Sequence, residues 1–171
     1  VLCGGPINYT ELPVGTNTSN AMIPVNGKPV IGWILDDLLH KGIERVILVM
    51  RWSDERFHEF IQRTYTKRMS LLLARVSGTG SIVQSLQAGL DLASTNGEIR
   101  VILGDTLVRD TFDGPGDYVY VGNVADSRRW CLVVLDEYQR ITAYLDKVVA
   151  RDGMENMALV GYYHFAHGYA L

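Results

Sequence analysis

The sequence has few of the features that mark several common classes of protein. Its two cysteines, Cys3 and Cys131, lie far apart, so neighbouring residues form neither a zinc site nor a redox CxxC pair. We expect both to be reduced thiols in a cytoplasmic protein. No apolar run approaches the roughly 18 residues that cross a bilayer, and no signal peptide is recognisable. Membrane insertion is therefore not expected.

An excess of positive charge is also missing. The 16 basic and 19 acidic residues give a formal net charge of -3, which does not favour nucleic acid as a partner. The four histidines show no HExxH pattern. A phosphate-binding enzyme needs only a few local cations, so the composition is compatible with one.

Length and periodicity predict one α/β domain. A chain of 171 residues suits a single domain, although Val1 and Leu171 adjoin apolar stretches, so we expect domain 1–171 to be cut from a longer chain at both ends. Apolar runs predict strands at 1–3, 45–50, 69–74 and 101–103, and helical spacing predicts helices between them, the second capped by Ser53. Strand-like runs follow at 118–121, 131–135, 141–145 and 158–165, with a hairpin connection at 136–139. The pattern predicts a Rossmann-like three-layer α/β/α fold with a mixed, mainly parallel sheet.

Three polar segments follow predicted strands: the loop 4–27, the turn 78–81, and Gly104 with Asp105. Ligands of open α/β sheets bind outside the carboxyl ends of the strands. The backbone of a glycine-containing loop, or a helix N-terminus, can approach an anion closely. Asp105 can hold a divalent cation that bridges phosphate oxygens, or it can cap backbone N–H groups of its turn. Arg51 and Trp52, at the end of another strand, can contact a ligand or serve packing.

Short motifs in a fixed order resemble the sugar-1-phosphate nucleotidylyltransferases, a family with a GT-A-like fold that includes glucose-1-phosphate thymidylyltransferase-like proteins. The segments are VLCGG at 1–5, AMIPVNGKP at 21–29, GTGS at 78–81, LGD at 103–105, DK at 146–147 and VGYY at 160–163. Each is short, but their order and spacing agree over nearly the whole chain.

The resemblance implies an enzyme that couples an NTP to a sugar 1-phosphate, or a similar phosphomonoester, and releases pyrophosphate. It implies Mg²⁺ as cofactor and Asp105 as its ligand and a catalytic residue. Lys28, at a position that usually starts a helix in the family, is a second catalytic candidate because it can partly replace the cation that the loop lacks. It further assigns nucleotide binding to Cys3, Gly4, Gly5, Gly78, Thr79 and Gly104, and substrate binding to Asp146, Lys147 and Gly161. The usual setting of the family is bacterial polysaccharide synthesis. A homo-oligomer or a larger fusion protein is compatible with the sequence.

The chain also departs from the family pattern. No Lys or Arg occurs from Val1 to Met22, and the family's lysine position holds Asn20. Cys131 stands where relatives often have a glycine, and a second metal-binding aspartate would lie beyond Leu171. Two alternatives therefore stay open: a non-catalytic relative that binds a nucleotide or sugar phosphate, and a GT-A-type glycosyltransferase. The latter needs a DxD-like cluster, of which Asp105 supplies one acid.

Overall fold

The computed structural model describes residues 1–5, 18–77, 81–93, 97–149 and 156–168, with three α-helices and nine β-strands assigned among them. The helices are α1 Val30–His40, α2 Glu55–Thr64 and α3 Ile82–Leu90, with short 3-10 turns at Asn20–Met22 and Ser127–Arg129. The strands are β1 Pro24–Val25, β2 Lys28–Pro29, β3 Arg45–Arg51, β4 Ser70–Val76, β5 Ile99–Ile102, β6 Tyr118–Asn123, β7 Cys131–Leu135, β8 Ile141–Asp146 and β9 Met157–Phe165.

The first residues of the chain join two groups of strands. Leu2 forms parallel bridges to Val49 of β3 and to Leu103 just after β5. On the outer side of β3, β4 pairs with it in parallel from Arg45 opposite Ser70 to Arg51 opposite Val76. Because these segments all run the same way, their carboxyl ends meet at one edge of the sheet.

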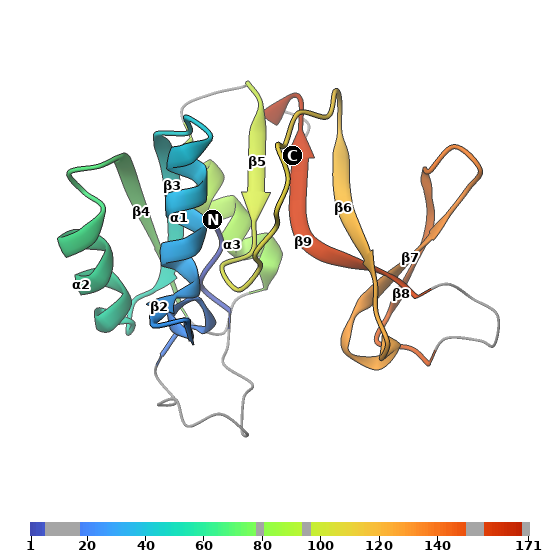
Figure 1. Cartoon of the computed structure of the whole chain (residues 1–171), viewed down its shortest axis with the longest axis horizontal. Coiled ribbons are helices and arrows are strands. Elements are labelled where there is room, and N and C mark those ends of the chain that lie inside the picture. Colours follow the sequence, from blue (N-terminus) through green and yellow to red (C-terminus); the bar gives the residue numbers. More distant parts are fainter. Residues whose placement is uncertain (6–17, 78–80, 94–96, 150–155, 169–171) are drawn as a thin grey trace.

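Helices cover both faces of this parallel part (Figure 1). Residues of α1 and α2 share a core with Val46, Leu48 and Met50, which alternate along β3. Val49 points to the other face, where a Cβ on Gly89 of α3 would lie 3.2 Å from its Cγ2. The expected three-layer α/β/α arrangement is thus present.

The chain itself explains where α1 begins and ends. Five apolar side chains recur at helical spacing and are buried on one face: Val30, Ile31, Ile34, Leu35 and Leu38. Pro29 precedes the first helical residue. Gly42 ends the helix with φ +73°, a conformation that glycine adopts without strain.

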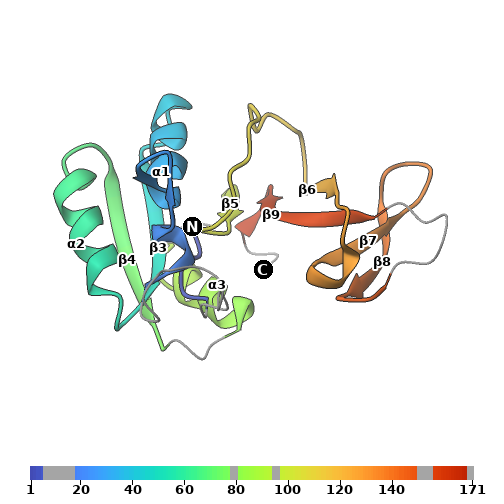
Figure 2. The same ribbon diagram turned by 60° about the horizontal axis from the view of Figure 1, so that its bottom comes forward.

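The second half of the chain forms a five-stranded antiparallel sheet. One end of β9 pairs with β5 and the other meets β7 at Ala158 opposite Leu132. The β7–β8 hairpin projects away from the helices (Figure 2). Among the described residues, no helix has both the length and the apolar character that crossing a bilayer requires.

Two details differ from expectation. The sheet is mixed as predicted, but the recorded parallel pairing involves only the first segment, β3, β4 and the residue after β5. The rest is antiparallel, because β9 runs antiparallel to every strand that it contacts. The N-cap of α2 is Asp54 rather than Ser53, since its side chain accepts the hydrogen bond from Phe57 N at 3.2 Å. A carboxylate at this position is also stabilised by the positive end of the helix dipole.

Candidate active site

The candidate site lies at the edge where the parallel segments end. Cys3 N donates to Val49 O (2.7 Å) and Gly104 N donates to Leu2 O (2.8 Å). These bonds place Gly4, the end of β3 and Asp105 side by side. Gly4, the first residue of the predicted loop, thus lies beside the Gly104–Asp105 turn as expected, while residues 6–17 of that loop lie outside the described residues.

A buried carboxylate fixes the return of the long loop to this edge. Asp54, 2% exposed, accepts from Ser19 N at 2.9 Å through Oδ2, while its Oδ1 caps α2. The Ser19 hydroxyl donates to Cys3 O at 3.0 Å. Ser19 is thus held from both sides, and the next residue, Asn20, is presented toward Asp105.

Asn20 and Asp105 form the polar centre of the edge. Asn20 Nδ2 donates to Asp105 Oδ2 at 3.3 Å, and the Asp105 carboxylate is exposed. Asn20 Oδ1 is buried without a hydrogen-bond partner among the described residues. Such an unpaired acceptor beside an exposed carboxylate is a polar environment that a bound cation or donor group would complete.

Asp105 and Asn20 supply oxygen ligands that suit Mg²⁺, but too few to hold the ion without a substrate. Mg²⁺ is commonly held by one or two carboxylates together with substrate phosphates, and Asp105 supplies one such carboxylate, with the Asn20 amide oxygen beside it. Among the residues that the structure describes, no three His, Cys, Asp or Glu side chains gather as a metal site. Any metal here would therefore depend on the substrate for most of its ligands.

Three glycines allow the segments to approach one another. A Cβ on Gly4 would lie 2.7 Å from Val76 Cγ2, and one on Gly104 only 2.5 Å from Cys3 Sγ. Gly161 of β9 has φ +85°, and a Cβ there would lie 2.7 Å from Thr106 Oγ1. Since Gly161 O accepts from Leu103 N at 2.8 Å, the structure brings this predicted sugar-site residue beside the Asp105 turn.

Cys3 can meet a ligand only through its backbone. The side chain is 5% exposed and is a free thiol. Burial raises the pKa of this thiol to about 12, with smaller effects from nearby charges. It is a protonated packing residue rather than a nucleophile. Gly5, which is also a predicted nucleotide-binding residue, is exposed with open space around it.

Lys28 has partners on α1. Its ammonium forms an ion pair with Asp36 and lies 4.3 Å from the centre of the Trp33 ring. Asp36 also pairs with Arg68 Nη1 at 2.9 Å. Burial alone would raise the pKa of Asp36, but hydrogen bonds from Lys28 and Arg68 lower it overall. These contacts give Lys28 a structural part, and its catalytic role stays a prediction.

Asp146 and Lys147 lie on the projecting hairpin. Asp146 is paired with Cys131 across β7 and β8, and Lys147 N donates to Trp130 O at 3.0 Å. Both side chains are exposed. In the described part of the chain no recorded contact links them to Asp105, so their substrate-binding role stays a prediction. Gly78 and Thr79 lie outside the described residues.

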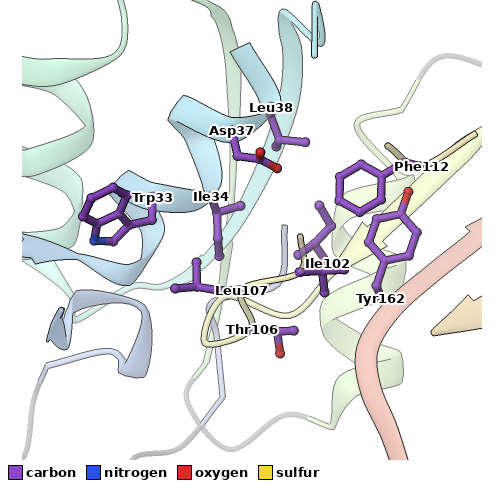
Figure 3. Close-up of a pocket in the computed structure, with 10 residues that line it drawn as sticks. Trp33, Ile34, Asp37, Leu38, Ile102, Thr106, Leu107, Phe112 and Tyr162 are labelled. Carbon is purple, nitrogen blue, oxygen red and sulfur yellow. The ribbon is translucent and has the colours of Figure 1, made fainter. Parts of the chain in front are cut away.

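A cavity that Thr106 and Leu107 line, beside the Asp105 turn, is too small for a nucleotide. A cavity of about 30 Å³ lies between α1 and the segment that follows β5 (Figure 3). Its walls are mainly apolar and include Trp33, Ile34, Ile102, Leu107, Phe112 and Tyr162. Ligand pockets typically enclose about 300–1,000 Å³. This cavity therefore does not hold a nucleotide.

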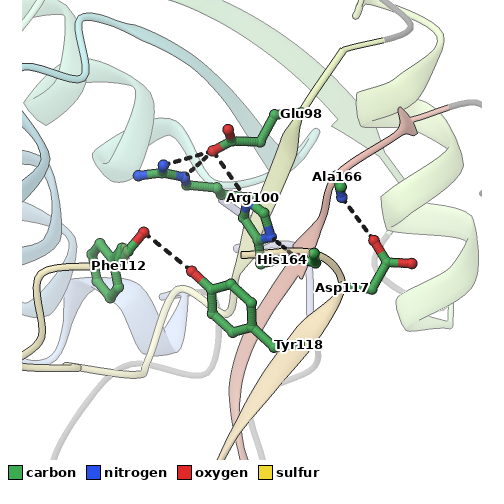
Figure 4. Close-up of polar contacts among 8 residues, drawn as sticks. Glu98, Arg100, Phe112, Asp117, Tyr118, His164 and Ala166 are labelled. Carbon is green, nitrogen blue, oxygen red and sulfur yellow. Dashed lines mark hydrogen bonds and ion pairs between the residues drawn. The ribbon is translucent and has the colours of Figure 1, made fainter. Parts of the chain in front are cut away.

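A second polar cluster lies at the other end of β5 (Figure 4). His164, 5% exposed, places Nε2 3.1 Å from Glu98 Oε1 and Nδ1 2.6 Å from Gly116 O. Arg100 Nη2 lies 2.6 Å from the same Glu98 oxygen. Burial acts to raise the pKa of Glu98, but the hydrogen bonds from Arg100 and His164 hold it below its ordinary value. The cluster ties β5 to β9 at the edge opposite the candidate site.

Sequence reasoning missed some of the residues that shape the edge. Ser19 and Asp54 are joined over 35 positions of sequence, and no local pattern indicates such a pair. Thr106 follows a motif residue, but its contact with Gly161 depends on β9. The only sequence signal for such residues is a polar residue at the end of a strand. This signal identified Arg51 but did not decide between ligand binding and packing.

Comparison with known proteins supports the family resemblance. The chain is 24% identical over 168 residues to the bifunctional protein GlmU of Methanocaldococcus jannaschii, covering 96% of this chain and 39% of the relative. It is 32% identical over 96 residues to GlmU of Symbiobacterium thermophilum, covering 55% of this chain and 18% of that protein. The chain thus spans less than half the length of these relatives. No protein-family model matches it.

Solved structures establish the fold. A putative glucose-1-phosphate thymidylyltransferase from Bacillus anthracis, in complex with a sucrose, matches with a TM-score of 0.80 at 19% identity, over 96% of this chain and 70% of that one. Apo UDP-glucose pyrophosphorylase matches with a TM-score of 0.74 at 18% identity, over 96% and 75% of the two chains. The fold is that of the nucleotidyltransferases, and the resemblance to sugar-1-phosphate nucleotidylyltransferases is confirmed.

Proposed function

We propose that this domain binds a nucleoside triphosphate and transfers its nucleotidyl group to a sugar 1-phosphate or a similar phosphomonoester. A phosphate oxygen of the acceptor attacks the α-phosphorus, the bond from that phosphorus to the β-phosphate bridge breaks, and pyrophosphate leaves with the bridging oxygen. The product is a nucleotide sugar. The observation that carries the proposal is the meeting of Gly4, Asn20, Asp105 and Gly161 at the carboxyl edge of the parallel strands.

The residues at this edge have distinct parts in the proposal. Gly4 and Gly104 let the first segment pack closely against β4 and the Asp105 turn, and this packing shapes the edge at which the phosphates would bind. The Ser19–Asp54 anchor holds Asn20 in place, which reduces the reorganisation needed when substrates bind. Gly161 and the Thr106 turn border the region that the acceptor sugar would occupy. Lys147 would reach the acceptor phosphate only if the hairpin approaches it.

A divalent cation such as Mg²⁺ would be held by Asp105 and substrate phosphates. When bound, it would neutralise charge that builds on the phosphoryl oxygens. Asn20, whose Nδ2 bonds Asp105, orients this carboxylate. We further propose the cytoplasm as the compartment and nucleotide-sugar supply for polysaccharide synthesis as the setting.

The reaction is tested by pyrophosphate release from a panel of NTPs with a panel of sugar 1-phosphates and Mg²⁺, using protein that contains this domain. Turnover with at least one pair is expected. Asp105→Asn should lower it by about 10²–10³-fold, the range typical of removing one group that stabilises transition-state charge. Its melting temperature should match the parent's, because Asp105 is exposed. Full activity in Asp105→Asn would contradict the assignment.

A non-catalytic nucleotide-binding relative is the second candidate. The observation that favours it is Asn20, a neutral amide bonded to Asp105 where the family has a lysine. This candidate predicts saturable NTP binding with no pyrophosphate release from any substrate pair. The same panel therefore separates the two functions.

A further inference from the structure

Arg51 ends β3 as a buried cation, two of whose side-chain nitrogens have no hydrogen-bond partner in the described part of the chain. Its side chain is 9% exposed, and both Nε and Nη2 are buried with no hydrogen-bond partner among the described residues. A guanidinium stays charged at physiological pH, and an uncompensated buried charge is strongly destabilising. Proteins keep such locally unfavourable groups chiefly where function requires them.

The position of Arg51 is at the candidate site. It stands opposite Val76 in the register of β3 and β4, at the carboxyl end of both strands. The parallel bridge of Leu2 to Val49, continued by two residues, brings Gly4 level with Arg51. The Asp105 turn lies on the other side of the first segment.

The face of Arg51 is the one that α3 covers. Side chains alternate along a strand, so Arg51 shares the face of Val49, which packs on Gly89 of α3. A Cβ on Gly4 would lie 3.4 Å from Ser85 Oγ, near the start of the same helix. Because α3 follows the carboxyl end of β4, its N-terminus, the positive end of its dipole, lies at this edge too.

The unpartnered atoms match the geometry of a phosphate. Nε and Nη2 form one edge of the guanidinium, with two roughly parallel N–H groups that bind two oxygens of a phosphate at once. The segment from Val1 to Met22 contains no Lys or Arg. A nucleoside triphosphate at this edge therefore needs a cation from elsewhere in the chain.

We propose that Arg51 is the phosphate-binding cation of this site and takes an oxyanion of the NTP triphosphate through its Nε–Nη2 edge. The inference rests on the proposed function, because it assumes that a triphosphate occupies the edge. In this proposal, Arg51 of β3 supplies the positive charge that the loop after Cys3 lacks.

The test compares Arg51→Met with Arg45→Met, which removes an exposed arginine from the opposite end of the same strand. Calorimetry measures the affinity of each variant for the NTP panel, for the corresponding nucleosides and for inorganic tripolyphosphate, all with Mg²⁺. Arg51→Met should lose about 10–100-fold in affinity for triphosphates, the range for a charge-assisted hydrogen bond. Its affinity for nucleosides, and every affinity of Arg45→Met, should stay within about twofold of the parent.

Thermal unfolding without ligand adds a readout that separates binding from structure. Arg51→Met should melt at or above the parent temperature, because an apolar chain of similar length replaces a buried guanidinium with two nitrogens unpaired among the described residues. Arg51→Lys keeps the charge but loses the two-pronged edge, so it should recover only part of the triphosphate affinity.

Two results would overturn the inference. One is an Arg51→Met variant that binds triphosphate as the parent does, and the other is an equal loss of nucleoside and triphosphate affinity with a lowered melting temperature. The proposed function is judged separately by turnover in the parent. If the parent binds tripolyphosphate through Arg51 but never releases pyrophosphate, the proposed nucleotidyl transfer is wrong and the phosphate-binding role of Arg51 still holds.

Discussion

The anchor of the long loop offers a quantitative test. Asp54 is 2% exposed and accepts one backbone hydrogen bond from Ser19 and one from Phe57, at 2.9 and 3.2 Å. Hydrogen bonds to charged groups contribute about 1.5–3 kcal/mol each when buried, and loss of an N-cap alone costs about 0.5–2 kcal/mol. Asp54→Ala should therefore lower the free energy of unfolding by about 2–5 kcal/mol.

The assay is urea unfolding with linear extrapolation, and Ser53→Ala is the matched control. Ser53 is exposed and caps no helix, so its replacement should change the free energy of unfolding by less than about 0.5 kcal/mol. Asp54→Asn should fall between them, because asparagine remains a good N-cap but its NH₂ group cannot accept from Ser19. Equal, small effects at 53 and 54 would refute the anchor.

Two further predictions concern packing and pH. Gly104→Ala should destabilise the protein by about 1–3 kcal/mol, since its Cβ would lie 2.5 Å from Cys3 Sγ, and Cys3→Ala in the same chain should restore part of the loss in thermal unfolding; no rescue would disprove this clash. The pKa of Glu98 is lowered in the folded state by Arg100 and His164, so its stabilisation is present above the ordinary glutamate value of 4.5 and is lost as pH falls through the folded value. In Glu98→Gln the melting temperature should therefore fall less as the pH is lowered. The difference from the parent should be small, because the Glu98 side chain is 49% exposed. A melting temperature with the same pH dependence as the parent's would exclude stabilisation by ionised Glu98.

Strong periodicity explains why much of the fold was predictable. The apolar run at 45–50 has the length and flanking residues of a buried strand, and the structure places β3 there. The hairpin at 136–139 was visible from its turn residues, and Asp136 Oδ1 accepts from Tyr138 N and Arg140 N. The direction of β9 was not predictable, because nothing local states whether a strand joins its neighbours in parallel.

The candidate site divides in the same way. Gly104 and Asp105 were identifiable because a glycine and an acid directly follow a buried strand. The choice between Ser53 and Asp54 as N-cap was not, since both residue types favour that position and only the distant Ser19 amide gives Asp54 its second bond. The contacts of Lys28 with Asp36 and Trp33 likewise arise only once β2 and α1 pack together.

Charge distribution connects these observations. A lysine at position 20 would stand within reach of Asp105 and compete with a metal for that carboxylate, whereas the Asn20 amide donates one hydrogen bond and leaves the charge of Asp105 uncompensated. An uncompensated carboxylate favours a divalent cation, but by itself it repels a triphosphate. A triphosphate bound at this edge, as proposed, would therefore need positive charge placed away from Asp105. Lys28 is already paired with Asp36, while Arg51 lies at the same edge of the sheet with two donor atoms that have no partner among the residues that the structure describes.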